Sequence, residues 1–307
     1  MEHVMITGAG GFIGCRLADF LIKNDIRVTA IVEPEFEVPD LLYHKNITII
    51  KIDLKSIMDV VDKIPSDIDA IYHFAWVGVD SKLKNEEKVQ LKNVEYGLNI
   101  LKVAGEKSIK KVICPGSASE YACFDGIITG AEAPQPSDMY AATKVAVHYL
   151  MDVYAMQKGI DLIWTLVTSI YGPGRKDNNL ITYAIKSFLK KEIPSFTKLE
   201  QRWDYLHISD LINALYLLGL HGKGGKVYPI GSGEERELSE YVEIIRNCID
   251  PNLKVNIGLL PYKTQRIDNS RVDISRLQVD TGFKPRYTFE KGIRETIEYF
   301  KCQPEEK

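Results

Sequence analysis

The sequence of 307 residues lacks a long apolar run, since no stretch approaches the roughly 20 consecutive apolar residues of a membrane-spanning helix. It also lacks a basic leader followed by an apolar segment at its start, so we expect neither a membrane protein nor an exported one. A surplus of positive charge is missing too: the net charge of −3 gives no reason to expect a nucleic acid or an anionic membrane as partner. Low-complexity segments and internal repeats are absent, and the length allows one large core or two domains.

The cysteines lack any paired spacing. There are five, an odd number, and they are scattered: Cys15, Cys114, Cys123, Cys248 and Cys302. This spacing matches neither a metal-ligand motif nor a disulfide framework. We therefore expect reduced thiols in a cytoplasmic protein, and no metal site.

A glycine motif lies between an expected strand and an expected helix. The apolar run 4–7 ends at Gly8, and Gly11 and Gly14 follow before residues 15–22, which have helical spacing. Backbone N–H groups at such a turn point at an anion, with the helix dipole behind them. Gly8 would permit the tight turn, Gly11 the approach of a pyrophosphate, and Gly14 the close packing of helix and strand. The motif predicts a dinucleotide site; a structural glycine turn is the alternative.

Acidic residues follow the next two expected strands. Glu33 comes after the strand 27–32, about 20 residues beyond the glycines, where a carboxylate accepts hydrogen bonds from the adenosine ribose and repels a 2′-phosphate. This favours NAD over NADP, and a solvated charge before Pro34 is the alternative. Asp53 follows the strand 47–52, where it could reach the adenine amino group.

Apolar runs and helical patterns alternate along the chain, which predicts a parallel sheet with helices on both faces. Further strands are expected at 70–75, 111–114 and 161–168, with a long helix from about 82 to 107 between the first two. Ser117 follows the strand 111–114. Because strand carboxyl ends face the ligand in open α/β sheets, we expect Ser117 at the cofactor crevice.

Three residue pairs have the spacing Tyr-x-x-x-Lys: Tyr140 and Lys144, Tyr154 and Lys158, and Tyr287 and Lys291. Only the first lies at the start of an amphipathic helix, expected at about 139–157, where one helical turn places Tyr140 and Lys144 on the same face. A Tyr, a Lys and a Ser beside a dinucleotide can move a hydride and a proton on or off a secondary alcohol. We therefore predict Ser117, Tyr140 and Lys144 as catalytic; an ordinary surface Tyr and Lys are the alternative.

At this point the chain resembles the extended short-chain dehydrogenases/reductases that act on nucleotide sugars, the NAD-dependent epimerase/dehydratase family. The resemblance covers nearly the whole chain. Besides the glycine motif, the matching segments are His73-Phe74-Ala75, Asn93-Val94, Ser117-Ala118-Ser119-Glu120-Tyr121, Tyr140-Ala141-Ala142-Thr143-Lys144, Tyr171-Gly172-Pro173-Gly174, Arg202-Trp203-Asp204-Tyr205-Leu206-His207 before Asp210, Asp273-Ile274-Ser275-Arg276 and Gly282-Phe283-Lys284-Pro285.

The resemblance implies a Rossmann-type doubly wound parallel sheet with a smaller C-terminal substrate-binding lobe, NAD as cofactor and a nucleotide-diphosphate sugar as substrate. The NAD-binding domain would comprise 1–168 plus about 205–228, and the lobe 169–204 and 229–307. The expected cofactor contacts are Gly8, Gly11, Phe12, Ile13, Gly14, Glu33, Asp53, Leu54, Phe74, Ala75, Asn93, Tyr140 and Lys144. The family also implies a homodimer built from the helices near 85–107 and 140–157.

The mechanism implied by the family fits the chemistry of these residues. Tyr140 would take the proton from a sugar hydroxyl while the carbon gives a hydride to NAD. A phenol with a pKa of about 10 is a poor base at neutral pH, but a neighbouring ammonium and the positive nicotinamide ring both favour the phenolate. Lys144 would lower the pKa of Tyr140 and hydrogen-bond the nicotinamide ribose, and Ser117 would hydrogen-bond the reacting oxygen.

One departure from the family concerns dehydration. Dehydrating members resemble Thr-Asp-Glu after the fifth strand, whereas this chain has Ser117, Ala118 and Ser119, without either carboxylate. Glu120 is one position late, and we expect it to face elsewhere because side chains alternate along an extended segment. Dehydration is therefore disfavoured, which leaves epimerisation or carbonyl reduction and alcohol oxidation.

A second departure concerns the substrate diphosphate. Leu166 stands where the family usually has Arg, and Ser169 where it usually has an Asn that contacts the diphosphate. Compensating cations are available, although each could equally be a solvated surface charge, and Asn179 could contact the nucleotide or merely cap a helix. The expected substrate-binding residues are Ser119, Ser169, Arg175, Asn179, Arg202 and Arg266.

We predict an NAD-dependent nucleotide-sugar epimerase, acting at C4 through a transient 4-keto sugar. Glu33 tilts the choice, because an epimerase regenerates its NAD in each cycle whereas biosynthetic reductases commonly draw on NADPH. An NAD(P)H-dependent reductase of an NDP-4-keto-6-deoxysugar is the alternative. A non-catalytic NAD-binding protein is a further one, but it would not need Ser117, Tyr140 and Lys144.

Overall fold

A sheet of seven parallel strands forms the centre of the protein. The computed structural model describes residues 1–80, 82–175, 177–262 and 271–303. The strands are hydrogen-bonded in the order β10-β6-β5-β4-β1-β2-β3. Their bounds are β1 (His3–Thr7), β2 (Arg27–Val32), β3 (Ile47–Lys51), β4 (Ala70–His73), β5 (Lys111–Ser117), β6 (Asp161–Val167) and β10 (Lys226–Ile230).

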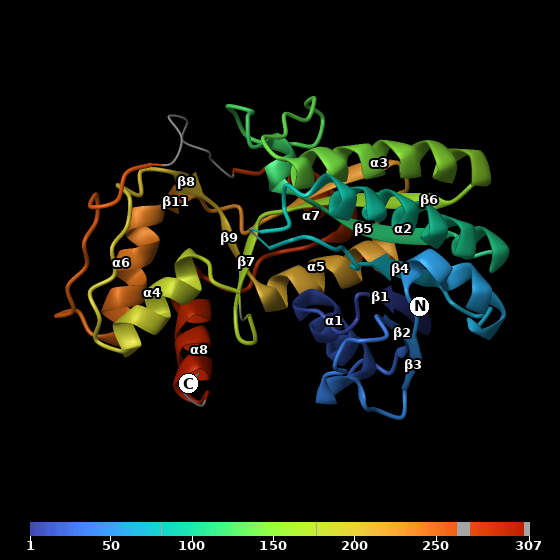
Figure 1. The fold of residues 1–307 in the computed structure, drawn as a ribbon, viewed down its shortest axis with the longest axis horizontal. Coiled ribbons are helices and arrows are strands. Elements are labelled where there is room, and N and C mark those ends of the chain that lie inside the picture. The colour runs from blue at the N-terminus through green and yellow to red at the C-terminus, as the bar shows by residue number, and fades with distance from the viewer. Residues whose placement is uncertain (81, 176, 263–270, 304–307) are drawn as a thin grey trace.

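Helices cover both faces of this sheet (Figure 1). On one face α1 (Phe12–Ile22) packs against α5 (Ile208–His221), and on the other α2 (Glu87–Glu106) packs against α3 (Met139–Lys158) and against the 3-10 helix η2 (Leu54–Lys63). Because both faces are covered, strands such as β1 are buried along their whole length. The predicted Rossmann-type doubly wound sheet is confirmed.

The order of the strands determines where a ligand binds. The sheet extends from β1 to β2 and β3 on one side and to β4, β5, β6 and β10 on the other, so that β1 lies between β2 and β4. Ligands of open α/β sheets bind at such a switch point, outside the carboxyl ends of the strands. The loops that follow β1, β2, β3 and β4 therefore meet at one crevice.

A second hydrophobic core forms the smaller lobe, on the left of Figure 1. It lies between α4 (Leu180–Leu189), α6 (Leu238–Ile249) and α8 (Phe289–Lys301). Two short sheets belong to this part of the chain, and their strands are β7 (Ser169–Tyr171) with β9 (Tyr205–His207), and β8 (Arg202–Trp203) with β11 (Arg236–Glu237).

The chain returns to the first core before it ends. α7 (Ser275–Thr281) packs against α5 and β10, and Leu277 and Phe283 are buried in the first core. Asp210 of α5 accepts the backbone N–H groups of Arg286 and Tyr287 at 3.0–3.1 Å. We therefore propose the predicted domain division (1–168 plus about 205–228; 169–204 plus 229–307) with one qualification, that residues near 272–283 pack with the nucleotide-binding part.

Two local features differ from the expected elements. The fifth strand runs on to Ser117 instead of ending near residue 114, and α2 begins at Glu87, later than expected. In the part of the chain that the structure describes, no helix combines the length and the apolar character needed to cross a membrane.

Candidate active site

The glycine loop forms a cradle between β1 and α1. Gly8 has a φ of +66°, a conformation that favours glycine, and a Cβ there would lie 2.6 Å from the nitrogen of Ala75. A Cβ on Gly14 would lie 2.3 Å from the carbonyl oxygen of Gly8. A Cβ on Gly11 would meet only that same oxygen, at 3.3 Å. Gly11 caps α1 without a side-chain hydrogen bond, so the first N–H groups of the helix stay available to an anion.

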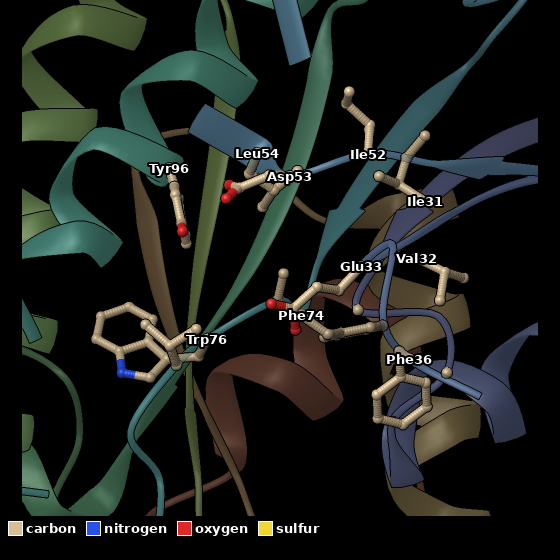
Figure 2. A pocket seen from close by; sticks show the side chains of 15 residues that line it. Ile31, Val32, Glu33, Phe36, Ile52, Asp53, Leu54, Phe74, Trp76 and Tyr96 are labelled. Carbon is tan, nitrogen blue, oxygen red and sulfur yellow. The ribbon is translucent and has the colours of Figure 1, made fainter. Parts of the chain in front are cut away.

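A pocket opens beside this loop (Figure 2). Its lining residues are Gly8, Gly10, Gly11, Ile31, Val32, Glu33, Phe36, Ile52, Asp53, Leu54, Phe74, Ala75, Trp76, Val77 and Tyr96. Seven of the predicted cofactor contacts are among them: Gly8, Gly11, Glu33, Asp53, Leu54, Phe74 and Ala75. Phe12, Ile13 and Gly14 lie in the first turn of α1 and are not part of the lining. A cradle of backbone N–H groups with two carboxylates at its far end fits a dinucleotide.

Aromatic side chains close the pocket on two sides, and sequence reasoning missed them. Figure 2 shows Tyr96 and Trp76 on one side and Phe36 on the other. The Phe36 ring covers Gly10, since a Cβ there would lie 2.6 Å from the ring. The Tyr96 phenol is hydrogen-bonded to Asp53, and burial together with that carboxylate raises the pKa of Tyr96 to about 12. Phe36 and Trp76 each stand shortly after a predicted strand, which is the signal that could have revealed them.

Asn93 has a different role from the one predicted. Its side chain is buried, its Oδ1 accepts the N–H of Val77 at 2.9 Å, and its Nδ2 donates to the carbonyl oxygens of Val77 and Gln90 at 3.1 Å. Its polar atoms are thus occupied by the loop between β4 and α2. This geometry does not support a direct contact of Asn93 with the cofactor; the residue holds the loop that lines the pocket.

Ser117, Tyr140 and Lys144 are brought together by three elements. Ser117 ends β5 and caps the 3-10 helix η3 (Ala118–Tyr121), while Asp138 caps α3 by accepting the N–H of Ala141 at 2.8 Å. Tyr140 lies in the first turn of α3 and is hydrogen-bonded to the Ser117 side chain. Lys144 follows one turn later, with its Nζ 5.8 Å from the centre of the Tyr140 ring. Their catalytic role stays a prediction.

Burial governs the protonation of the pair. It raises the pKa of Tyr140 above its usual value, the charge of Glu120 acts in the same direction, and the hydrogen bond with Ser117 opposes both. Burial also lowers the pKa of Lys144 to about 8, and its Nζ donates to the carbonyl oxygen of Pro115 at 2.6 Å. The expected lowering of the Tyr140 pKa by Lys144 is not found: burial dominates the shift, and the group that lowers this pKa is Ser117.

Glu120 points into the interior. The residue is 1% exposed, its Oε1 accepts the N–H of Ser117 at 2.7 Å, and Trp164 donates to the carboxylate at 3.4 Å. Burial raises the pKa of Glu120 to about 7. The segment after Ser117 is a 3-10 turn, not the extended strand on which the expectation rested. In this orientation Glu120 cannot supply the acid that a dehydration would need.

The predicted substrate residues do not gather into one anion site. Ser119 lies beside Ser117, because its hydroxyl donates to Ser117 Oγ at 2.8 Å. Ser169 accepts the indole N–H of Trp203 at 2.7 Å. Asn179 caps α4, since its Oδ1 accepts the N–H groups of residues 181 and 182. This is the helix-capping alternative that the sequence had left open for Asn179. Arg266 lies outside the described residues.

Arg175 and Arg202, the other two arginines predicted to bind the substrate, form ion pairs with carboxylates of the protein. Arg175 forms a bidentate ion pair with Asp177 at 2.6 and 2.9 Å and donates to the carbonyl oxygen of Ile170. Arg202 pairs with Glu235 at 3.1 Å. Each would have to exchange a protein carboxylate for a substrate phosphate.

The rival Tyr-x-x-x-Lys pairs lie elsewhere. Tyr154 lies near the end of α3, before Gly159 in the left-handed conformation, and Tyr287 stacks on His207 with the ring centres 4.0 Å apart.

A serine at a strand end that is hydrogen-bonded to the tyrosine of a Tyr-x-x-x-Lys helix, at a dinucleotide crevice, defines an NAD-dependent enzyme of the extended short-chain dehydrogenase/reductase type. The model of one family within this class, described as the NAD dependent epimerase/dehydratase family, matches residues 4–231, and the chain belongs to that family.

The chain is also similar to individual proteins. The chain is similar to the UDP-N-acetylglucosamine 4-epimerase of Methanobrevibacter ruminantium M1, solved in complex with UDP-N-acetylmuramic acid, with 27% identity, a TM-score of 0.88 and 99% of each chain covered. An uncharacterized protein of Methanocaldococcus jannaschii, MJ1055, is 27% identical, over 97% of this chain and 96% of its own. A dTDP-glucose 4,6-dehydratase of Streptomyces niveus is 24% identical, over 97% and 93%.

Proposed function

We propose that the protein interconverts the C4 epimers of a nucleotide-diphosphate sugar. The observation that carries the proposal is the hydrogen-bonded pair of Ser117 and Tyr140 with Lys144 one turn away, in a site from which the carboxylates of a dehydratase are missing. The interior orientation of Glu120 supports it, because the carboxyl group nearest to Ser117 in sequence is directed away from a substrate. The similarity to a UDP-N-acetylglucosamine 4-epimerase supports the substrate class.

Ser117 is prepared to act as a hydrogen-bond donor. Its Oγ accepts the backbone N–H of Ser119 at 3.2 Å and the Ser119 hydroxyl at 2.8 Å. With both acceptor positions used, the proton of Ser117 is left to be donated to Tyr140 or to the reacting oxygen of the sugar. Ser119 thus positions Ser117, which extends its predicted role as a substrate contact.

In the proposed reaction Tyr140 accepts the proton of the C4 hydroxyl, and Ser117 hydrogen-bonds the same oxygen as it becomes a carbonyl. Bound NAD would supply the acceptor for the C4 hydride and the donor for its return to the opposite face of the keto sugar, and the positive charge of its oxidised ring would favour the phenolate form of Tyr140. Tyr140 then gives the proton back, so that the sugar is inverted at C4 and no cofactor is consumed. The loop glycines, Glu33 and Asp53 would hold the cofactor for this cycle.

Substrate and cofactor stoichiometry test the proposal. Purified protein with catalytic NAD should interconvert the C4 epimers of one member of a panel of nucleotide-diphosphate hexoses, without net change in reduced nicotinamide absorbance. Tyr140→Phe serves as the control for contaminating epimerases. Stoichiometric oxidation of NADH or NADPH by an NDP-4-keto-6-deoxysugar, without epimerisation, would replace the epimerase by the reductase.

A homodimer through α2 and α3 is part of the proposal. Apolar side chains on the outer face of these helices are exposed to solvent: Leu91, Tyr149, Leu150, Val153 and Met156. Positions 149, 153 and 156 follow helical spacing and form one stripe on α3. A second copy of the chain, contributing the same two helices, would bury this stripe in a four-helix contact.

A further inference from the structure

Trp76 lies where the dinucleotide pocket ends and the catalytic residues begin. The indole lines the pocket, whereas none of Ser117, Tyr140 and Lys144 does. Yet Lys144 Nζ lies only 3.7 Å from the centre of the Trp76 ring, and the Tyr140 ring packs edge-on against it at 5.9 Å and 76°. The ring therefore separates the pocket from the catalytic pair and contacts both members of the pair.

The orientation of the indole is fixed from behind. Its Nε1 donates to Gln90 Oε1 at 3.2 Å, and Gln90 is fully buried. The same Gln90 donates to the carbonyl oxygen of Gly78 at 2.6 Å, and Asn93 holds Val77 on both of its backbone polar groups. A rotation of the ring would break this partly buried hydrogen bond, so its face stays turned toward Lys144.

Few groups compensate the charge of Lys144 directly. Lys144 is 4% exposed, and among the described residues no carboxylate lies within ion-pair distance of it, although the charge of Glu120 acts on it from further away. The nearest partners of the ammonium are the Pro115 carbonyl oxygen at 2.6 Å and the Trp76 ring face at 3.7 Å, with the Tyr140 ring further away at 5.8 Å. Ring centre distances below about 6 Å make such a contact attractive, most of all for tryptophan and where water is excluded.

We propose that Trp76 is a positioning residue of the catalytic pair, whose ring face holds the Lys144 ammonium in its charged form beside Tyr140. This inference rests on the proposed function only in so far as Lys144 serves Tyr140. The residue acts through Lys144 and takes no part in proton or hydride transfer itself.

The direction of the effect follows from the contact. A ring face attracts the ammonium and not the neutral amine, so Trp76 favours protonation and opposes the burial that lowers the pKa of Lys144 to about 8. The other ionisable groups that face Lys144 are Tyr140, Glu120, Cys114 and His73. Glu120 acts in the same direction as Trp76, and removal of the ring should lower the pKa of Lys144 further.

Titration of Lys144 tests this without any substrate. In protein carrying isotope-labelled lysine, the ε-carbon resonance of Lys144, assigned by its loss in Lys144→Arg, is followed against pH. Trp76→Leu should move the midpoint down by roughly one pH unit, and Trp76→Phe by less, because phenylalanine keeps a weaker ring face. Trp203→Phe, in the smaller lobe, is the matched control and should leave the midpoint unchanged. An unchanged midpoint in Trp76→Leu overturns the proposal.

Fluorinated tryptophans at position 76 provide the second arm, since they keep the shape of the ring and the bond to Gln90 while weakening its negative face. The midpoint should fall stepwise with each added fluorine; a constant midpoint, or equal effects of Trp76→Leu and Trp76→Phe, would contradict the role of the ring face.

In turnover, the high-pH limb of the kcat profile should move with the midpoint while KM changes little. A parent protein inactive on every nucleotide sugar would refute the proposed function, yet leave the titration readable.

Discussion

The Glu120 carboxylate, which is buried, accepts the backbone N–H of Ser117 at 2.7 Å. Pro115 lies two residues before Ser117, and its carbonyl oxygen accepts a hydrogen bond from Lys144 Nζ at 2.6 Å. Two buried ionisable side chains thus hold the last three residues of β5, and Ser117 is placed by the backbone and not only by its own hydroxyl.

This relationship predicts a pH-dependent stability difference for Glu120→Gln. Burial raises the pKa of Glu120 from 4.5 to about 7, so the folded state binds an extra proton between these two pH values. The contribution of this proton to the free energy of unfolding is fully present below pH 4.5 and is lost as the pH rises through about 7. The amide keeps an acceptor for Ser117 but does not titrate. Relative to the parent, the free energy of unfolding of Glu120→Gln should therefore improve from about pH 5 to about pH 8. Urea denaturation at several pH values measures it.

The surface variant Glu106→Gln is the control for that measurement, since Glu106 is exposed on α2. A parallel pH dependence of the Glu120→Gln variant and the parent would show that Glu120 is already charged at low pH.

Tyr140→Phe should keep NAD binding nearly unchanged and reduce turnover by about 100-fold or more, because only the proton acceptor is lost. Fluorescence titration with NAD and steady-state assays measure the two effects separately. Tyr154→Phe, which has the same motif spacing at the far end of α3, should retain full activity. Substantial activity of Tyr140→Phe would mean that another group is the base.

Glu33 should make NAD bind more tightly than NADP. The side chain is exposed at the pocket wall, where Glu33→Arg replaces repulsion of the 2′-phosphate by attraction and should narrow or reverse the preference. Glu35→Arg, an exposed neighbour that does not line the pocket, controls for net charge. Equal affinities of the parent for both cofactors would remove the argument from Glu33.

Val153→Glu should convert a dimer into a monomer. Val153 is 52% exposed in the middle of the apolar stripe of α3, and a charge there would have to be desolvated in the proposed four-helix contact. Light scattering gives the mass of both proteins. Val279→Glu, at an even more exposed valine (84%) on α7, should not change the mass. A monomeric parent would dismiss the contact.

The nucleotide-binding half could be predicted from the sequence because its signals are local. Gly8, Gly11 and Gly14 describe one turn, and Glu33 and Asp53 follow directly after strands whose ends must meet at one edge of the sheet. The same logic predicted Ser117 near the carboxyl end of a strand, and Ser117 is the last residue of β5, although it does not line the pocket.

The contacts of the predicted substrate-binding residues could not be predicted from the sequence, because each of these side chains can bind either another protein group or the substrate. Asp177 lies two residues after Arg175, and a sequence pattern does not say whether the guanidinium binds that carboxylate or a substrate phosphate. The inward turn of Glu120 was expected for the wrong reason, since it depends on a 3-10 helix that no periodicity in four residues can reveal. Trp76 matters through two residues, Lys144 and Gln90, that are remote in sequence.

The return of residues 272–283 to the first core limits how such proteins can exchange specificity by recombination. A single crossover that replaced everything after residue 230 would also replace Leu277 and Phe283, which fill the core beneath α5, and the N–H groups of Arg286 and Tyr287 that Asp210 binds. A viable chimera would need to keep this stretch from the nucleotide-binding parent and insert the donor's α6 and α8 on either side of it. Substrate preference in this architecture should therefore diverge more readily by point substitution in the smaller lobe than by transfer of one contiguous gene segment.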